Sequence, residues 1–262
     1  MNNISGKTIL ITGASSGIGR SFAYQCALKW AHLIIVSRTE SILLDIARDI
    51  HSKYSVSVEV IVGDLSQKET PQMIFDEVQK RGLSVDILVN NAGFGKWVSF
   101  LSQKVETYQD MIALNIASLV TLTHLFLPKM LEKKSGGIIN VASTAAFFPC
   151  PYISVYGATK AFVLSFTEAL ASEYSESVLT IMALCPGNTE TGFQKMAQVD
   201  LKWEMVESAD QVVKNALGAY EKGKIFIVSG WFNKILTSLP RFLSRSMILK
   251  IVKKSTQKSA QQ

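Results

Sequence analysis

The chain is organised around a glycine-rich turn near its start, Thr12-Gly13-Ala14-Ser15-Ser16-Gly17-Ile18-Gly19. An apolar, β-branched run from Thr8 to Thr12 leads into this turn, and a helical stretch from about Ile18 to Trp30 follows it. Glycines here let the backbone turn sharply and approach a pyrophosphate, while the helix N-terminus faces its negative charge. The stretch therefore predicts a strand, turn and helix that bind a dinucleotide.

Short β-rich runs alternate with longer helical stretches beyond this turn. Strands are expected at Thr8 to Thr12, Leu33 to Val36, Val56 to Val62, Ile87 to Val89, Ile138 to Val141, Val178 to Leu184 and Ile225 to Val228. Helices are expected at Ile18 to Trp30, Glu40 to Tyr54, Gln72 to Arg81, 104–133 (one long helix or two abutting ones) and Ser154 to Tyr174. This alternation is typical of a parallel sheet covered on both faces. We expect an α/β fold with a single Rossmann-like, doubly wound domain (1–230), which includes a substrate loop at about 188–206, followed by a helical tail (231–262).

Composition limits the class of protein. The 262 residues are 48% hydrophobic, enough for one large core. We find no apolar run of the roughly 20 residues that span a bilayer, and the first run is too short for a signal peptide. The three cysteines, Cys26, Cys150 and Cys185, are widely spaced and fit no metal-ligand pattern. We therefore expect free thiols, no metal and a cytoplasmic location.

Charge is divided unevenly along the chain. Residues 1–221 hold 18 basic and 21 acidic residues, a net charge of −3, whereas nine basic residues and no acid follow Glu221. The dispersed basic residues of the body argue against nucleic-acid binding. The tail mixes cations with many apolar residues, and Pro240 divides it into two short helices. It suits a peripheral membrane contact, a lid over a pocket or an oligomer arm, and we expect Lys253 to Gln262 to be disordered.

The ends of the predicted strands carry polar residues that would meet in one crevice, where α/β sheets bind ligands. Strand two ends in Ser37-Arg38-Thr39, strand three in Asp64-Leu65, and strand four in Asn90-Asn91-Ala92-Gly93. A carboxylate after strand two would favour NAD. Ser37 does not repel a 2′-phosphate and Arg38 can pair with one, so NADP(H) is preferred and NAD(H) is less favoured.

Tyr156 and Lys160 are four residues apart and share one face of the expected helix. A phenol normally has a pKa near 10, and a neighbouring ammonium would lower it towards neutrality. Ser143, which follows strand five, would hold a substrate carbonyl or alcohol against the phenol.

Together these motifs resemble the short-chain dehydrogenase/reductase family, most nearly its NADP-preferring bacterial branch of reductases similar to 17β-hydroxysteroid and 3-ketoacyl reductases. The matching motifs are TGASSGIG at 12–19, Asp64, NNAG at 90–93, Asn115, Ser143, YGATK at 156–160 and PGNTET at 186–191. They extend from about residue 7 to residue 228. The resemblance implies a nicotinamide-dependent oxidation or reduction and a homodimer or homotetramer built through 104–133 and 154–174.

The resemblance also implies roles for individual residues. Tyr156 would be the general acid/base and Ser143 would orient the substrate, whereas Lys160 would hold the nicotinamide ribose and lower the pKa of the tyrosine. Asn115 would bulge its helix and link Lys160 to a proton relay through water. Besides Tyr156 and Lys160, the implied cofactor contacts are Gly13, Ser15, Ser16, Gly17, Ile18, Gly19, Ser37, Arg38, Thr39, Asp64, Leu65, Asn91, Ala92, Gly93, Pro186, Gly187, Thr189 and Thr191. Thr189 stands where a branched aliphatic residue is more usual.

The expected substrate side is apolar and aromatic. It comprises Phe94, Trp97, the segment from Ala145 to Tyr152, which includes Cys150, and Phe193 to Trp203. Such a lining favours a hydrophobic ketone or aldehyde. We predict hydride transfer between NADP(H) and a carbonyl or secondary alcohol held by Ser143 and Tyr156. The alternatives are an idle NADP(H)-binding redox sensor and NAD-dependent alcohol oxidation.

Overall fold

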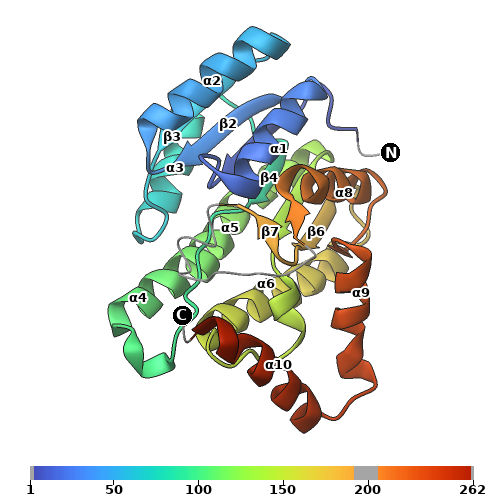
Figure 1. Ribbon diagram of the computed structural model, residues 1–262. Helices are drawn as coiled ribbons and strands as arrows, with labels where there is room; N and C mark the ends of the chain where they lie inside the picture. The colour runs from blue at the N-terminus through green and yellow to red at the C-terminus, as the bar shows by residue number, and fades with distance from the viewer. Residues whose placement is uncertain (1–2, 192–205, 261–262) are drawn as a thin grey trace.

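A computed structural model describes residues 3–191 and 206–260 (Figure 1). Its main sheet has seven strands, all paired in parallel, in the order β3-β2-β1-β4-β5-β6-β9. These strands are β1 (Thr8–Thr12), β2 (His32–Ser37), β3 (Val58–Val62), β4 (Ile87–Asn90), β5 (Gly137–Val141), β6 (Thr180–Cys185) and β9 (Phe226–Val228). Two short strands, β7 (Thr189–Glu190) and β8 (Glu207–Ser208), pair separately. The predicted doubly wound α/β fold is confirmed.

Helices cover both faces of the sheet. They are α1 (Gly17–Leu28), α2 (Glu40–Tyr54), α3 (Thr70–Lys80), α4 (Val105–Ile112), the π-helix η2 (Ala113–Ala117), α5 (Ser118–Lys133), α6 (Ser154–Glu173), α8 (Ala209–Glu221), α9 (Trp231–Ser238) and α10 (Arg245–Ala260). Short 3-10 turns are η1 (Phe100–Ser102), η3 (Thr144–Phe147) and η4 (Leu239–Arg241). Alternate strand residues face opposite sides, so Ile9 and Ile11 pack in the core with α1, α2 and α8, and Leu10 packs in the core with α3 and α5. Burial on both faces explains the continuous apolar runs of these strands.

Two helices differ from the sequence-based expectation. Helix α8 was not predicted, although Ser208 caps it by accepting from the Gln211 amide at 3.2 Å and Val212, Ala216 and Leu217 form its buried face. The residues from Lys253 onward were expected to be disordered, but α10 continues to Ala260. Thr256 is buried there, which shows that the helix packs against the body well beyond Lys253.

The helix Val105–Lys133, formed by α4, η2 and α5, is long and apolar enough by length and composition to cross a membrane, and it is the one such helix in the described part of the chain. The sequence predicts a helix over this range but not an apolar stretch long enough to cross a membrane. Here 44% of the apolar stretch is buried inside the protein. Phe126 packs edge-on against Phe75 of α3, with ring centroids 5.2 Å apart, so this part of the helix is built into the core.

A buried polar network joins the centre of the sheet to the helices. The Asn90 amide on β4 donates to Asn140 Oδ1 on β5 at 2.9 Å and to Thr123 Oγ1 on α5 at 3.2 Å. Asn140 Nδ2 in turn donates to Thr167 Oγ1 on α6 at 3.0 Å. All four side chains are buried. Because buried polar groups are costly when unpaired, this network fixes α5 and α6 against the strands that lead to the crevice.

We expect Asn140→Ala to lower the free energy of unfolding by about 2–3 kcal/mol, because it removes partners of two buried groups at once. Urea unfolding at fixed protein concentration measures this difference. The matched control is Gln72→Ala, which breaks an exposed hydrogen bond to Asp76 on α3 and should change stability by less than about 0.5 kcal/mol. Equal stability of the two variants would show that the network contributes nothing to the fold.

Candidate active site

The glycine-rich turn is shaped by close contact with the turn after β4. A Cβ added to Gly19 would lie 2.3 Å from the Gly13 carbonyl oxygen and 2.4 Å from Asn91 Nδ2, so only glycine fits there. Gly13 and Gly17 have φ of +66° and +53°, which also favours glycine. Asn91 Nδ2 donates to the carbonyl oxygens of Thr12 and Gly13 at 2.8 and 3.2 Å. The two turns therefore form one rigid unit.

The N-terminus of α1 suits a phosphate group. Ser16 is the N-cap residue, yet its side chain makes no capping hydrogen bond, and the first turn of the helix contains no acidic residue. Its leading amides are thus not satisfied by a cap and face no competing carboxylate. The turn, which has no Cβ at Gly13, Gly17 and Gly19, and the uncapped helix end together fit the pyrophosphate of a dinucleotide, the ligand that the sequence predicts. Ser15, Gly17 and Ile18 lie in this turn and at the start of the helix.

The ends of β2 and β3 would face the adenosine half of such a ligand. Arg38 is exposed, and its Nη1 lies 3.9 Å from Asp64 Oδ2. Asp64 Oδ1 accepts from the Ser66 amide at 3.0 Å and from its hydroxyl at 2.8 Å. Ser37 is buried and its Oγ lies 3.4 Å from the Thr39 amide, from which it accepts. The guanidinium is therefore loosely held and reachable, and no carboxylate occupies the end of β2.

Ser143, Tyr156 and Lys160 come together at the carboxyl end of β5. The Tyr156 and Ser143 side chains are hydrogen-bonded to each other. The Ser143 oxygen also accepts from the Ala145 amide at 3.1 Å, which orients it. Lys160 Nζ donates to the Val141 carbonyl at 2.7 Å and lies 5.8 Å from the centroid of the Tyr156 ring. The predicted side chains thus form one cluster.

Asn115 joins this cluster to the turn after β4. It lies in the π-helix η2, so the helix bulge implied by the resemblance is present. Its amide is held in both directions by Phe94, whose N–H donates to Asn115 Oδ1 at 3.1 Å and whose carbonyl accepts from Nδ2 at 3.0 Å. Nδ2 also donates to Thr159 Oγ1 at 3.0 Å. A Cβ on Gly93 would lie 3.0 Å from Asn115 Oδ1 and 3.5 Å from Lys160 Nζ, so these groups meet closely.

The protonation of Tyr156 and Lys160 is governed by burial. Burial raises the pKa of Tyr156 to about 12, although the hydrogen bond with Ser143 opposes this rise. Burial also lowers the pKa of Lys160 to about 8. Both shifts disfavour the charged form, as desolvation requires. The prediction that Lys160 brings the pKa of Tyr156 below its usual value is therefore wrong for this structure, in which burial dominates and the opposing effect comes from Ser143.

The segment after β6 packs between the glycine turn and the tail. A Cβ on Gly17 would lie 2.9 Å from Thr191 Cβ, and one on Gly187 would lie 2.3 Å from Asn233 Nδ2 of α9. Asn233 is itself held, because Nδ2 donates to the Ser229 carbonyl at 2.7 Å. The hydroxyl of Thr189 donates to the Gly187 carbonyl at 3.0 Å. Asn233 was not predicted as a site residue, because its contact with Gly187 joins residues that are 46 positions apart in the sequence.

An apolar cluster packs around Tyr156. Buried Ala145, Cys150 and Ile153 pack with the partly buried residues Trp97, Phe148, Tyr156 and Val252. Val252 belongs to α10 and was not predicted here. Burial raises the pKa of the Cys150 thiol to about 12, which fits packing and not nucleophilic chemistry. The predicted lining residues Phe193 to Trp203 lie outside the described residues.

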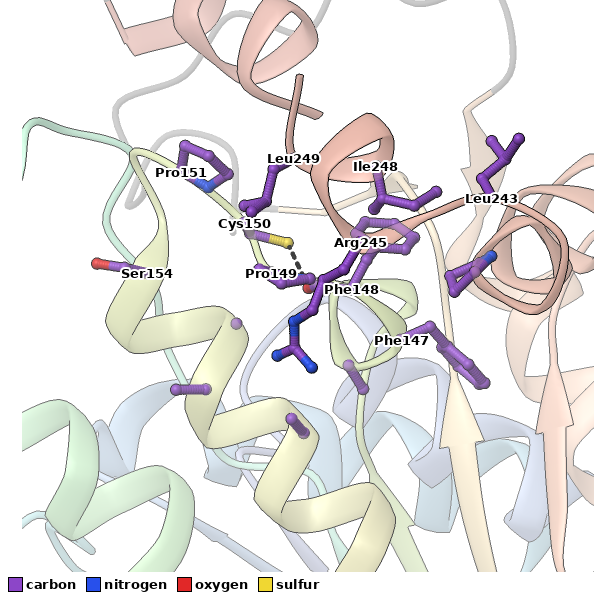
Figure 2. Close-up of a pocket in the computed structure, with 15 residues that line it drawn as sticks. Phe147, Phe148, Pro149, Cys150, Pro151, Ser154, Leu243, Arg245, Ile248 and Leu249 are labelled. Carbon is purple, nitrogen blue, oxygen red and sulfur yellow. Dashed lines mark hydrogen bonds between the residues drawn. The ribbon is translucent and has the colours of Figure 1, made fainter. Parts of the chain in front are cut away.

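A groove of about 740 Å³ runs beside this cluster, between the segment after β5, α6 and the tail (Figure 2). Its walls are mainly apolar and include Phe147, Phe148 and Pro149 on one side and Leu243 and Leu249 on the other. Figure 2 shows Arg245 extending from the start of α10 across the groove towards α6. The tail therefore forms one wall of this groove, whose lining on α6 is Ser154, Gly157, Ala158 and Ala161 and does not include Ser143 or Tyr156.

A family model described as short chain dehydrogenase matches residues 7–202. The chain is 34% identical over 218 residues to the NADP-dependent 3-hydroxy acid dehydrogenase of Schizosaccharomyces pombe, covering 82% of this chain and 83% of that protein. It is 34% identical over 217 residues to 17-beta-hydroxysteroid dehydrogenase type 3 of Mus musculus, covering 81% and 68%.

Among solved structures, a short-chain dehydrogenase from Sphingobium yanoikuyae in complex with NADPH superposes with a TM-score of 0.80 at 28% identity, covering 96% of this chain and 95% of that one. The seven-stranded parallel sheet with helices on both faces agrees with this structural similarity. The family model covers well over half of the chain, so the protein belongs to the short-chain dehydrogenase/reductase family of oxidoreductases.

Proposed function

We propose that the protein transfers hydride between NADP(H) and the carbonyl or secondary alcohol group of a hydrophobic substrate. The observation that carries this proposal is the hydrogen-bonded pair of Ser143 and Tyr156 with Lys160 beside it. This cluster lies at the same edge of the sheet as the glycine turn and the open N-terminus of α1. A protein that only bound the dinucleotide would need the turn but not the paired hydroxyl groups.

The nicotinamide ring, when bound, supplies hydride to a carbonyl carbon or accepts it from an alcohol. The chain's own task is to hold the substrate oxygen and move its proton. The hydroxyl groups of Ser143 and Tyr156 donate hydrogen bonds to that oxygen. In reduction the Tyr156 hydroxyl transfers its proton to the oxygen, and in oxidation the phenolate takes a proton back.

The high pKa of Tyr156 suits the direction of reduction. With a pKa of about 12 the phenol is fully protonated at neutral pH and is ready to donate. When hydride adds to the carbonyl carbon, the electron pair of the C=O π bond moves to the oxygen, which becomes far more basic than a phenolate, so the proton transfer from Tyr156 is downhill. Lys160 lies next to the Tyr156 ring. Below its pKa of about 8 the Lys160 amine is protonated, and its positive charge then stabilises the phenolate that remains after the proton transfer.

The cofactor preference rests on the end of β2. Arg38 is exposed and Ser37 cannot repel a phosphate, a pattern that supports NADP(H). Two of the similar proteins carry NADP or NADPH in their names. The apolar cluster around Tyr156 and the adjacent groove support a hydrophobic ketone, a class to which the similarity to a hydroxysteroid dehydrogenase also points.

We expect Tyr156→Phe to reduce kcat/KM for carbonyl reduction by about 10²–10⁴-fold, the usual contribution of a positioned acid. The affinity for NADPH should change little, because the glycine turn and Arg38 are untouched. Steady-state kinetics and a fluorescence titration with NADPH measure the two effects. Tyr174→Phe, which removes a phenol hydroxyl just beyond the end of the same helix, is the control and should stay active. Near-normal turnover of Tyr156→Phe would overturn the proposal.

We expect Arg38→Ala to weaken NADPH binding by roughly 10- to 100-fold, the effect of losing one charge-assisted contact. NADH affinity should stay nearly constant, because NADH has no 2′-phosphate. Titration of the unaltered protein and of the variant with NADPH and with NADH measures both affinities. The control is Arg48→Ala, which removes an exposed guanidinium paired with Asp45 on α2. Equal losses for NADPH and NADH would contradict the assignment and would leave NAD-dependent alcohol oxidation as the better hypothesis.

A further inference from the structure

The last three elements of the tail expose large apolar side chains. Trp231 is 66% exposed and Phe242 is 82% exposed. Further exposed apolar residues on α9 and α10 are Phe232, Ile235, Met247 and Ile251. Figure 1 shows α9 running down the right side of the molecule and α10 turning back across its lower end. Together with Leu249, which lines the groove, seven large apolar side chains are exposed in a segment of 21 residues, more than scattered surface hydrophobicity explains.

The same elements carry unpaired positive charge. Lys234, Arg241, Lys250, Lys253 and Lys254 are exposed. Within residues 3–191 and 206–260 every ion pair lies at or before Glu221, so none of these five cations meets a carboxylate. We name these five cations and the six apolar residues Trp231, Phe232, Ile235, Phe242, Met247 and Ile251 the tail surface.

The opposite sides of these helices anchor them to the body. Ile248 and Thr256 of α10 are buried, and Val252 packs in the cluster around Tyr156. On α9, Thr237 is buried and Asn233 packs against Gly187. The tail surface is therefore not needed to hold the helices in place. It is an ordered face, combining apolar and cationic groups, that is available to a partner.

We propose that the tail surface docks on the surface of a lipid bilayer that contains anionic lipids. Exposed Trp231, Phe242 and Ile251 would enter the boundary between headgroups and acyl chains, and the lysines would lie among the headgroup charges. A second copy of the chain fits less well, because a twofold contact would place one cationic tail against another. The body of a copy carries a net charge of only −3, and seven of its 21 carboxylates are in ion pairs within the described residues.

Co-sedimentation of the full chain with vesicles tests the proposal. One set of vesicles contains phosphatidylcholine alone, and the other contains phosphatidylcholine mixed with phosphatidylglycerol. We expect binding to the anionic vesicles, weaker binding to the neutral ones, and loss of binding at high salt. Absence of binding to both sets, or equal binding to both, would overturn the proposal.

Two variants separate charge from apolar contact. Combining Lys250→Gln, Lys253→Gln and Lys254→Gln should lower the partition coefficient on the order of 100-fold, since each basic residue near an anionic surface contributes about fivefold. Its control combines Lys68→Gln, Lys104→Gln and Lys134→Gln, which removes the same charge from exposed lysines of the body. Binding that falls equally in both would indicate general charge attraction and overturn the assignment to the tail.

The second variant combines Trp231→Ser and Phe242→Ser, and we expect it to bind vesicles at least tenfold more weakly. Its control combines Trp30→Ser and Leu101→Ser, whose side chains are 63% and 90% exposed on other parts of the molecule. Unchanged NADPH affinity in all four variants verifies the fold. If the tail variants alter the oligomeric mass in light scattering and the unaltered chain binds no vesicles, the tail surface is an interface between copies and the lipid proposal is wrong.

Discussion

The contact between the glycine turn and the turn after β4 is the constraint on which the rest of the site depends. Asn91 closes this contact by donating to the carbonyls of Thr12 and Gly13, and the absence of a side chain on Gly19 makes room for it. The neighbouring residues of the same turn point elsewhere. Asn90 enters the buried network with β5, and Gly93 meets Asn115. One turn thus fixes the glycine turn, the core, and the cluster of Ser143, Tyr156 and Lys160 relative to one another.

Burial then determines the chemistry of the cluster. Desolvation disfavours both the phenolate of Tyr156 and the ammonium of Lys160, so the structure holds a protonated acid beside an amine that titrates near neutrality. Oriented dipoles compensate only in part, through the Val141 carbonyl for the lysine and the Ser143 hydroxyl for the tyrosine. The pair is thus poised to gain or lose charge when a charged or polar ligand enters, a property typical of functional sites.

Sequence reasoning succeeded where a feature is local. The bounds of β1 and α2 agree with the prediction, because apolar spacing and nearby turn residues define them. The site could be predicted because carboxyl ends of parallel strands must meet. Sequence reasoning failed where contacts between distant segments determine the structure. The partner of Asn90 lies 50 positions away, and α10 stays helical beyond Lys253 in a packed segment where Thr256 is buried. The pKa of Tyr156 was misjudged because the degree of burial is not visible in the spacing of Tyr156 and Lys160.

The tail shows why composition alone could not choose among its three interpretations. A lid, an oligomer arm and a membrane helix all require apolar and basic residues in helical segments, and they differ only in which side of the helix faces the body. In the structure Val252 packs against the apolar cluster of Ala145, Cys150 and Ile153, whereas Met247 and Ile251 of the same helix are exposed. The inner side of α10 therefore packs against the apolar cluster that also includes Tyr156. Because this inner side and the outward surface belong to one helix, whatever binds the exposed side acts on an element that also touches the cluster around Tyr156.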